Sequence, residues 1–263
     1  MSIVIETKNL KKIYGLKGIE SIALDEIDLE VEKGEFLGIM GPSGAGKTTL
    51  LNIISTIDTP TSGSYLFEGK DMAKVKGKEL ANFRKNKISF IFQDFNLLDT
   101  MSVQDNIALP LALSKVKSEE IIKRVNAVAG FLGLKDHLSK YPYQLSGGQK
   151  QRTAAARALI TSPSVIFADE PTGALDSKSA AELLQCLTEL NEKFKTTIIM
   201  VTHDAFAASY CRRIMFIKDG KLHAKLDKNQ GRKEFFQRIM DMCASMSGGT
   251  DFYGQKEKSG RDF

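Results

Sequence analysis

The chain has 263 residues, of which 42% are hydrophobic and 26% are charged, a composition typical of one large globular domain or one domain with an inserted subdomain. The formal net charge of +5 is too small to favour a nucleic-acid-binding protein and is compatible with an anionic membrane surface. No apolar run approaches the roughly 18 residues of a membrane span, and residues 1–6 lack a signal-peptide pattern, so we expect any membrane role to come through a partner. Cys186, Cys211 and Cys243 lie far apart without metal-ligand spacing, which favours a reduced, cytosolic protein.

The N-terminal stretch predicts half-exposed strands, because hydrophobic and polar residues alternate at 3–5 and again at 22–31. Between these stretches Tyr14 precedes a glycine. Taken alone, Tyr14 is an ordinary strand aromatic. If the chain binds a nucleotide, Tyr14 becomes a candidate stacking platform for adenine, an interaction that stabilises binding by about 1–3 kcal/mol.

The next segment contains the most informative motif. An apolar run at 36–40 predicts a buried strand, and an apolar helix is expected to begin at 48; residues 41–48 between them read Gly-x-x-x-x-Gly-Lys-Thr, the phosphate-binding loop pattern. Its glycines let backbone N–H groups turn toward phosphate oxygens, and the helix adds its positive end. Lys47 is expected to reach the β- and γ-phosphates and Thr48 to ligate Mg²⁺. The residues predicted to hold the nucleotide phosphates are Gly41, Pro42, Ser43, Gly44, Ala45, Gly46, Lys47, Thr48 and Thr49.

Further along, a strand at 64–67 and a helix at 79–85 precede another buried strand at 88–92, which ends at Gln93. A glutamine at the end of a strand commonly just caps a loop. At the carboxyl edge of an α/β sheet, where ligands bind, Gln93 could instead contact Mg²⁺ or the attacking water.

From about 95 to 160 the pattern becomes helical. Within it, Ser146 is a good helix N-cap, and Gly147 and Gly148, followed by Gln149, leave the first amides of the helix uncovered. This arrangement predicts a second anion site, with a plain glycine-flanked cap as the alternative. One phosphate cannot use both sites within a single chain. It could use both if two chains faced each other in a dimer.

Acidic residues follow the next buried strand, at 164–168. Two adjacent carboxylates at the end of a core strand are costly unless a cation or a proton transfer occupies them. We therefore expect Asp169 to hold Mg²⁺, through water, and Glu170 to polarise the attacking water. A further strand at 196–202 ends at His203, which shares this sheet edge and is a candidate for contacting the γ-phosphate.

The C-terminal part predicts a hairpin with an Asp-Gly turn at 219–220 and an amphipathic helix at 231–246. We expect this helix to pack on its own domain, with docking on a partner as the alternative. His137 and His223 carry no motif and are predicted to lie on the surface. The apolar helix face is expected to comprise Phe235, Phe236, Ile239, Met240, Met242, Cys243 and Met246.

Taken together, these motifs resemble those of ABC-transporter ATP-binding subunits over almost the whole chain. The phosphate-binding loop is common to many families, but Leu-Ser-Gly-Gly-Gln at 145–149, between that loop and the acids at 169–170, is specific to ABC ATPases. Four other positions match the adenine-stacking aromatic, Q-loop, D-loop and switch histidine of that family, in this order: Tyr14, Gln93, Asp176 and His203.

The resemblance implies a head-to-tail homodimer on a transmembrane permease at the cytoplasmic face of the cell membrane, with ATP and Mg²⁺ as cofactors and no nucleic-acid partner. Ser146, Gly147 and Gly148 of one chain would close on the ATP held by Lys47 and Thr48 of the other. The permease groove is expected around residues 93–101, and the resemblance also suggests a sensor kinase as a partner through the permease.

A closer resemblance is to the peptide-antibiotic exporter and resistance group that includes bacitracin systems, carried by residues 90–99, 167–178 and 207–211 and by the tail helix. Macrolide-export, lipoprotein-release and cell-division ATPases are wider relatives, and the last two remain alternative assignments. A nucleic-acid-associated ABC ATPase is the alternative from another class, but the interval from Gln93 to Ser146 is short and has no coiled-coil heptads.

The expected fold is α/β, with a phosphate-loop core, an N-terminal antiparallel β subdomain and an inserted helical subdomain at about 95–162. We expect an ATPase domain at 1–228, an amphipathic helix at 229–247 and a disordered tail at 248–263. The expected activity is ATP hydrolysis coupled to transport.

Overall fold

In the computed structural model, which describes residues 2–16 and 19–246, the strands form two sheets. One is antiparallel, in the order β2-β1-β4-β5, and the other has the order β10-β9-β3-β8-β7-β6. In the second sheet β9, β3, β8, β7 and β6 are parallel, and only β10 pairs in the antiparallel sense. The strands are β1 (Ile3–Leu16), β2 (Ile19–Glu32), β3 (Phe36–Met40), β4 (Ser62–Phe67), β5 (Lys70–Asp71), β6 (Ile88–Phe92), β7 (Val165–Asp169), β8 (Thr197–Val201), β9 (Arg213–Lys218) and β10 (Lys221–Asp227).

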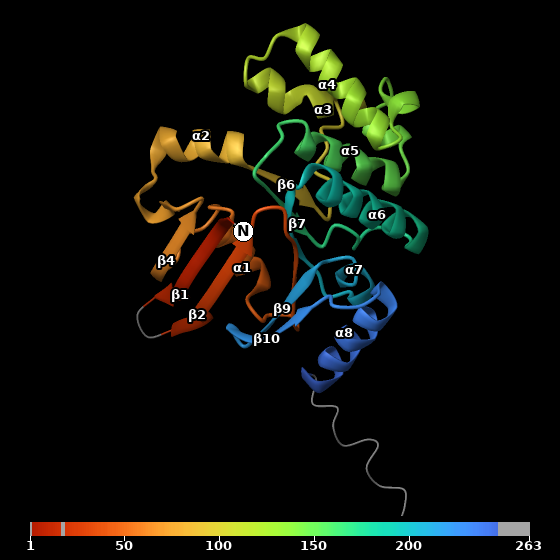
Figure 1. Cartoon of the computed structure of the whole chain (residues 1–263). Coiled ribbons are helices and arrows are strands. Elements are labelled where there is room, and N and C mark those ends of the chain that lie inside the picture. Colours follow the sequence, from red (N-terminus) through yellow and green to blue (C-terminus); the bar gives the residue numbers. More distant parts are fainter. Residues whose placement is uncertain (1, 17–18, 247–263) are drawn as a thin grey trace, which may run out of the picture.

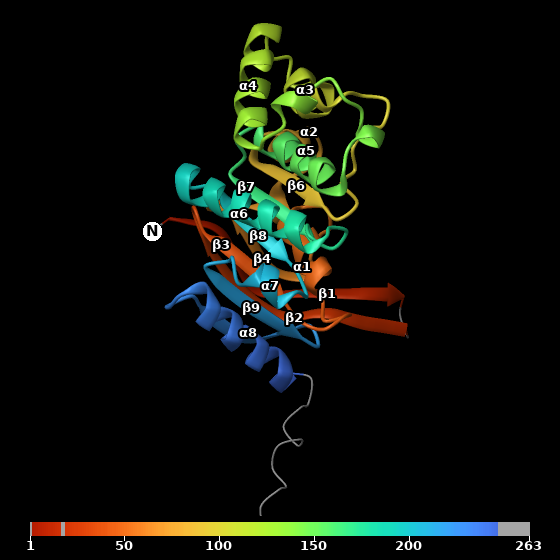
Figure 2. The ribbon, with the colours of Figure 1, turned by 90° about the vertical axis from the view of Figure 1, so that its right-hand side faces the viewer.

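The helices cover the parallel sheet, and some of them project beyond it at one end of the molecule. In Figure 1, α3 and α4 lie beyond α5, on the far side of the molecule from the antiparallel sheet. Figure 2 shows the same three helices stacked together, with the hairpin of β1 and β2 projecting sideways and α8 at the opposite end. The helices are α1 (Lys47–Ile54), α2 (Gly77–Lys87), α3 (Val103–Leu113), α4 (Ser118–Phe131), α5 (Gly147–Leu159), α6 (Ser177–Phe194), α7 (Ala205–Ala208) and α8 (Arg232–Met246).

The alternating side chains of the parallel strands divide the interior into two cores. In β3, Phe36 and Met40 face the core shared with α5, α6 and α8, whereas Leu37 and Ile39 face the core shared with α1 and the antiparallel sheet. Burial on both faces explains why these strands read as continuous apolar runs in the sequence. The predicted α/β architecture with a β subdomain and a helical subdomain is confirmed.

The C-terminal helix α8 packs on its own domain, as expected. Phe235 and Ile239 are almost fully buried in the core that also contains α6, and Met246 is largely buried. The predicted apolar face was too wide, because Met240 is 44% exposed. The tail expected to be disordered, at 248–263, lies outside the described residues. Among the residues that the structure describes, no helix combines the length and hydrophobicity needed to cross a membrane.

Candidate functional site

Polar residues from four strand ends meet at one edge of the parallel sheet. The loop at 41–46 follows β3, Gln93 follows β6, Asp169 ends β7 with Glu170 directly after it, and His203 comes two residues after β8. Because these strands are parallel, their carboxyl ends lie at the same edge, the usual place for ligands in α/β sheets. The structure therefore brings these predicted site residues to one side of the sheet.

The glycines of the loop at 41–46 adopt backbone conformations that disfavour any side chain. Gly41, Gly44 and Gly46 have φ angles of 153°, 77° and 100°. In addition, a Cβ atom at Gly41 would overlap the carbonyl of Ile217, and one at Gly46 would overlap that of Ala23. Glycine is required at these two positions both for conformation and for space.

The amino-terminal end of α1 is open to a ligand. Its N-cap residue, Gly46, has no side chain to cap the first N–H groups, and Thr48 in the first turn is exposed. Lys47 curls over the loop, with its Nζ donating to the carbonyl oxygens of Gly41 and Pro42 at 2.9 Å each. An uncapped helix start beneath a lysine ammonium is suited to anionic oxygen ligands.

The acids after β7 are held in a defined arrangement. Glu170 has a left-handed backbone with φ 46°, and its N–H donates to the carbonyl of Val201 at 2.9 Å. Its Oε1 accepts from the backbone N–H of His203 at 3.1 Å and lies 2.8 Å from His203 Nδ1. Burial and the neighbouring charge of Glu170 raise the pKa of Asp169, whereas the charge of Lys47 opposes that rise. The charges of Lys47 and Glu170 therefore both reach the carboxylate of Asp169.

Gln93 lies against the turn that follows the acids. A Cβ atom added to Gly173 would come within 3.0 Å of both Cδ and Nε2 of Gln93. Gly173 itself donates its N–H to the carbonyl of Glu170 at 3.0 Å. The amide of Gln93 is therefore close to the carboxylate-bearing turn, although its role toward Mg²⁺ or water stays a prediction.

The predicted cap of the second anion site is confirmed, and it has an additional contact. Ser146 Oγ accepts from the N–H of Gln149 at 3.3 Å, and Gln149 Oε1 accepts from the N–H of Ser146 at 2.9 Å. The side-chain nitrogen Nε2 of Gln149 also lies 2.8 Å from His137 Nε2. The prediction that His137 is a surface residue is wrong, since it is half-buried and supports this cap; the same prediction for His223, which is exposed, is confirmed.

The predicted second anion site lies on the helical subdomain, beside the start of α6. A Cβ atom added to Gly147 would have the side chain of Leu175 as its nearest neighbour, and one added to Gly148 would have that of Ser179. Asp176 acts as the N-cap of α6, accepting the N–H groups of Lys178 and Ser179 at 3.0 Å. Whether residues 146–149 and Asp176 contact a nucleotide stays a prediction.

Tyr14 has a hydrogen-bonded hydroxyl and a partly exposed ring. The hydroxyl donates to Asp58 Oδ2 at 2.7 Å, and Lys12 Nζ lies 4.8 Å from the ring centroid. The residue is 43% exposed, so part of the ring is accessible to a ligand. Its assignment as an adenine platform stays a prediction.

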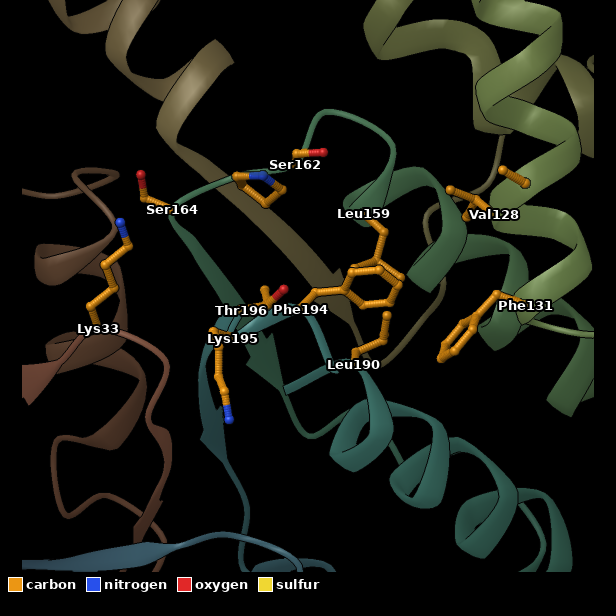
Figure 3. A pocket seen from close by; sticks show the side chains of 12 residues that line it. Lys33, Val128, Phe131, Leu159, Ser162, Ser164, Leu190, Phe194, Lys195 and Thr196 are labelled. Atoms are coloured by element: carbon orange, nitrogen blue, oxygen red, sulfur yellow. The ribbon is translucent and has the colours of Figure 1, made fainter. Parts of the chain in front are cut away.

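Two cavities show where the sequence was uninformative. One of about 230 Å³ lies at the edge described above, where Pro42 and His203 are joined by Cys243 and Met246 from the last turn of α8. Nothing local in the sequence indicates this contact. A larger one, of about 530 Å³, lies between α4 and the end of α6 and includes Phe194 (Figure 3). It contains none of the predicted site residues and lies near the amino ends of β7 and β8, away from the phosphate-binding loop.

Comparison with known proteins gives consistent matches. The ABC transporter family model matches residues 24–173. The chain is 52% identical over 246 residues to the bacitracin export ATP-binding protein BceA of Halalkalibacterium halodurans, an alignment that covers 93% of this chain and 97% of that protein. It is 50% identical over 252 residues to the uncharacterised ABC transporter ATP-binding protein YvcR of Bacillus subtilis, covering 95% and 96% of the two chains. The dimeric ATP-binding cassette MJ0796, solved with ADP and Pi, has a TM-score of 0.77 and 39% identity, covering 85% of this chain and 98% of that one.

Proposed function

The chain belongs to the ABC transporter family of ATP-binding subunits, and from that premise we propose that its ATP hydrolysis powers a membrane permease for peptide-antibiotic export or resistance. The observation that carries the proposal is the 52% identity to a bacitracin export subunit across 97% of that protein's length. In this scheme residues 1–228 form the ATPase domain, with a helical subdomain at about 95–162, and α8 is an appended helix.

The nucleotide would be held by the loop at 41–48. Lys47 and the first N–H groups of α1, which no side chain of the described residues caps, are suited to the phosphates, and Tyr14 on β1, whose ring is partly exposed, would stack on the base. Glu170 would polarise the attacking water, and His203, whose ring nitrogen lies beside the Glu170 carboxylate, would contact the γ-phosphate.

The residues at the sheet edge are suited to Mg²⁺. Asp169 is half-buried and carries a raised pKa beside a second acid, and a nearby cation would favour its ionised form. Within the described residues, no group of three or more His, Cys, Asp or Glu side chains could hold a metal ion alone. We infer that Thr48, Gln93 and Asp169 would share the ion with phosphate and water oxygens, the environment that Mg²⁺ prefers. When bound, the ion would neutralise charge on the phosphates.

A second copy of the chain would complete the site. Residues 146–148 lie on the helical subdomain rather than beside the phosphate-binding loop, so a head-to-tail dimer would allow both anion sites to hold one ATP. The dimeric state of the MJ0796 cassette supports a dimer by analogy.

The permease is proposed to dock at residues 93–101, at the cytoplasmic face of the membrane. The buried amide of Asn106 fixes part of this segment: Oδ1 accepts from the N–H of Leu98 at 2.8 Å, and Nδ2 donates to the carbonyls of Leu98 and Met101 at 3.0 and 3.1 Å. Leu98 is nevertheless 43% exposed. A hydrophobic side chain displayed on a rigid loop is suited to docking.

The test combines genetics with co-purification. Deleting this protein should sensitise its bacterium to peptide antibiotics that bind cell-wall lipid intermediates, and Lys47→Ala should reproduce the deletion. The tagged chain should co-purify with a permease from detergent-solubilised membranes. Unchanged sensitivity, together with a defect in lipoprotein sorting or division, would contradict the peptide-antibiotic assignment.

A further inference from the structure

The helix α5, which begins with the second anion site, also contacts two other loops of the site. Gln151, in its second turn, is fully buried. Its Nε2 donates to the carbonyl of Phe92 at 3.1 Å and to that of Pro171 at 2.7 Å. Phe92 directly precedes Gln93, and Pro171 directly follows Glu170. A single amide therefore joins the backbone beside both of these candidate catalytic residues.

Farther along the same helix, Arg157 holds the segment that follows Gln93. Its Nη1 donates to the carbonyl of Asn96 at 2.6 Å, and its Nη2 donates to that of Phe95 at 3.0 Å. Phe95 and Asn96 have left-handed backbones, with φ angles of 61° and 47°. Two consecutive non-glycine residues in this conformation are unfavourable by themselves, and the planar guanidinium fork fits the pair of carbonyls that results.

We propose that Gln151 and Arg157 are positioning residues that make α5 a rigid link between residues 92–96, the turn at 169–171 and the second anion site. A displacement of the segment after Gln93 would then move the carboxylate of Glu170 and the cap at Ser146 together. The inference rests on the proposed ATPase mechanism and adds two residues to it.

A purely structural role, in which the two side chains only satisfy buried carbonyls, is the alternative. One observation argues against it for Gln151: among the described residues its Oε1 is buried and has no hydrogen-bond partner. A buried polar atom without a partner lowers stability, so the amide of Gln151 stabilises the fold less than a fully bonded amide would. Its two hydrogen bonds are therefore weaker evidence for a purely structural role than they would be if both ends of the amide were bonded.

The variants Gln151→Met and Arg157→Met test the proposal in the full-length chain. Each keeps side-chain bulk but removes the donors to the carbonyls. Matched controls are Gln185→Met and Arg124→Met, because within the described part of the chain Gln185 and Arg124 each bond a partly exposed glutamate on their own helix and no backbone carbonyl. We expect kcat for ATP to fall by at least ~10-fold in both test variants, with the Kd for ATP within ~3-fold of wild type and little change in either control.

Hydrogen exchange tests the same link without requiring hydrolysis. Amides at 92–98 should exchange faster in both test variants, whereas those at 169–173 should exchange faster in Gln151→Met at least, because only Gln151 contacts Pro171 directly. Arg157→Lys should restore part of the protection at 95–96, since an ammonium can bond one of the two carbonyls.

The outcomes separate the possibilities. Unchanged exchange at 92–98 in both folded variants would overturn the proposal. An ATP affinity that falls in parallel with Tm would indicate a structural role only and would also overturn it. A wild-type chain without ATPase activity, alone or with its permease, would refute the proposed function, while the exchange data would still decide whether α5 is a rigid link.

Discussion

The substitution Glu170→Gln should separate hydrolysis from nucleotide binding. Glu170 Oε1 accepts the backbone N–H of His203 at 3.1 Å, and a glutamine oxygen can accept the same bond. The shape of the turn should survive, and only the negative charge is lost. General-base catalysis contributes about 10²–10⁴-fold to a rate, so the chemical step should slow by at least ~10²-fold. That corresponds to about 2.7 kcal/mol in the activation barrier.

Binding should persist in this variant, because the loop amides and Lys47 are untouched. Since the charge of Glu170 raises the pKa of Asp169, removing that charge should leave Asp169 more readily ionised and able to serve Mg²⁺. ATP would then remain unhydrolysed between two chains, and a dimer should accumulate with ATP but not with ADP. Ser146→Arg in the same background should abolish this dimer, because a bulky side chain would fill the second anion site.

Single-turnover hydrolysis, equilibrium binding of a fluorescent ATP analogue and size-exclusion chromatography measure these three quantities. Glu182→Gln is a matched control, since Glu182 is an exposed residue of α6 that forms an ion pair with Arg152. Hydrolysis by Glu170→Gln at the wild-type rate would refute the catalytic assignment. A Glu170→Gln chain that stays monomeric with ATP, even alongside its permease, would count against the dimer instead.

Three other predictions concern the scaffold and the loop. Glu35→Gln should lower the free energy of unfolding by about 3 kcal/mol in urea titrations. Glu35 is 5% exposed and accepts from Arg213 at 2.7 and 3.1 Å, so the substitution leaves Arg213 without its charged partner. A loss below about 1 kcal/mol would contradict this. Ile239→Ala should lower the free energy of unfolding by about 2–5 kcal/mol in the same measurement, since this side chain of α8 is fully buried in the core, and unchanged stability would mean that α8 is not part of the core. Gly46→Ala should abolish ATP binding without unfolding the chain, because residue 46 has a φ of 100° and its new Cβ would overlap the carbonyl of Ala23. Normal ATP affinity in a fluorescence titration would refute the requirement for glycine.

The strand ends of the site could be predicted from the sequence because they depend on local patterns. Apolar runs of strand length are followed by the loop at 41–46, by Gln93, by Asp169 and Glu170, and by His203. Because these strands pair in parallel, their carboxyl ends lie at one edge of the sheet, and the residues that follow them meet there. The cap at residues 146–149 was predictable for the same reason, since its bonds join near neighbours in the chain.

Long-range polar contacts left almost no trace in the sequence. Gln151 bonds a carbonyl 59 positions away, and Arg157 bonds carbonyls 61 and 62 positions away. The signal for Gln151 was a polar residue in the stripe of buried residues on α5, but Arg157 had no such signal. His137 was misassigned because its contact with Gln149 depends on how the turn before α5 folds back. The error at Met240 shows that a helical face read from the sequence can be drawn too wide.

The left-handed backbone at Glu170 has a consequence for how this protein can be engineered. Its φ of 46° is tolerated most easily by glycine or asparagine, and a glutamate there costs about 1 kcal/mol. A selection for heat resistance should therefore tend to recover Glu170→Gly or Glu170→Asn, because either change relaxes the backbone. Each of these gains would remove the carboxylate that turnover is expected to require. At this position durability and activity are selected in opposite directions, so a stabilised variant has to gain its stability elsewhere in the chain.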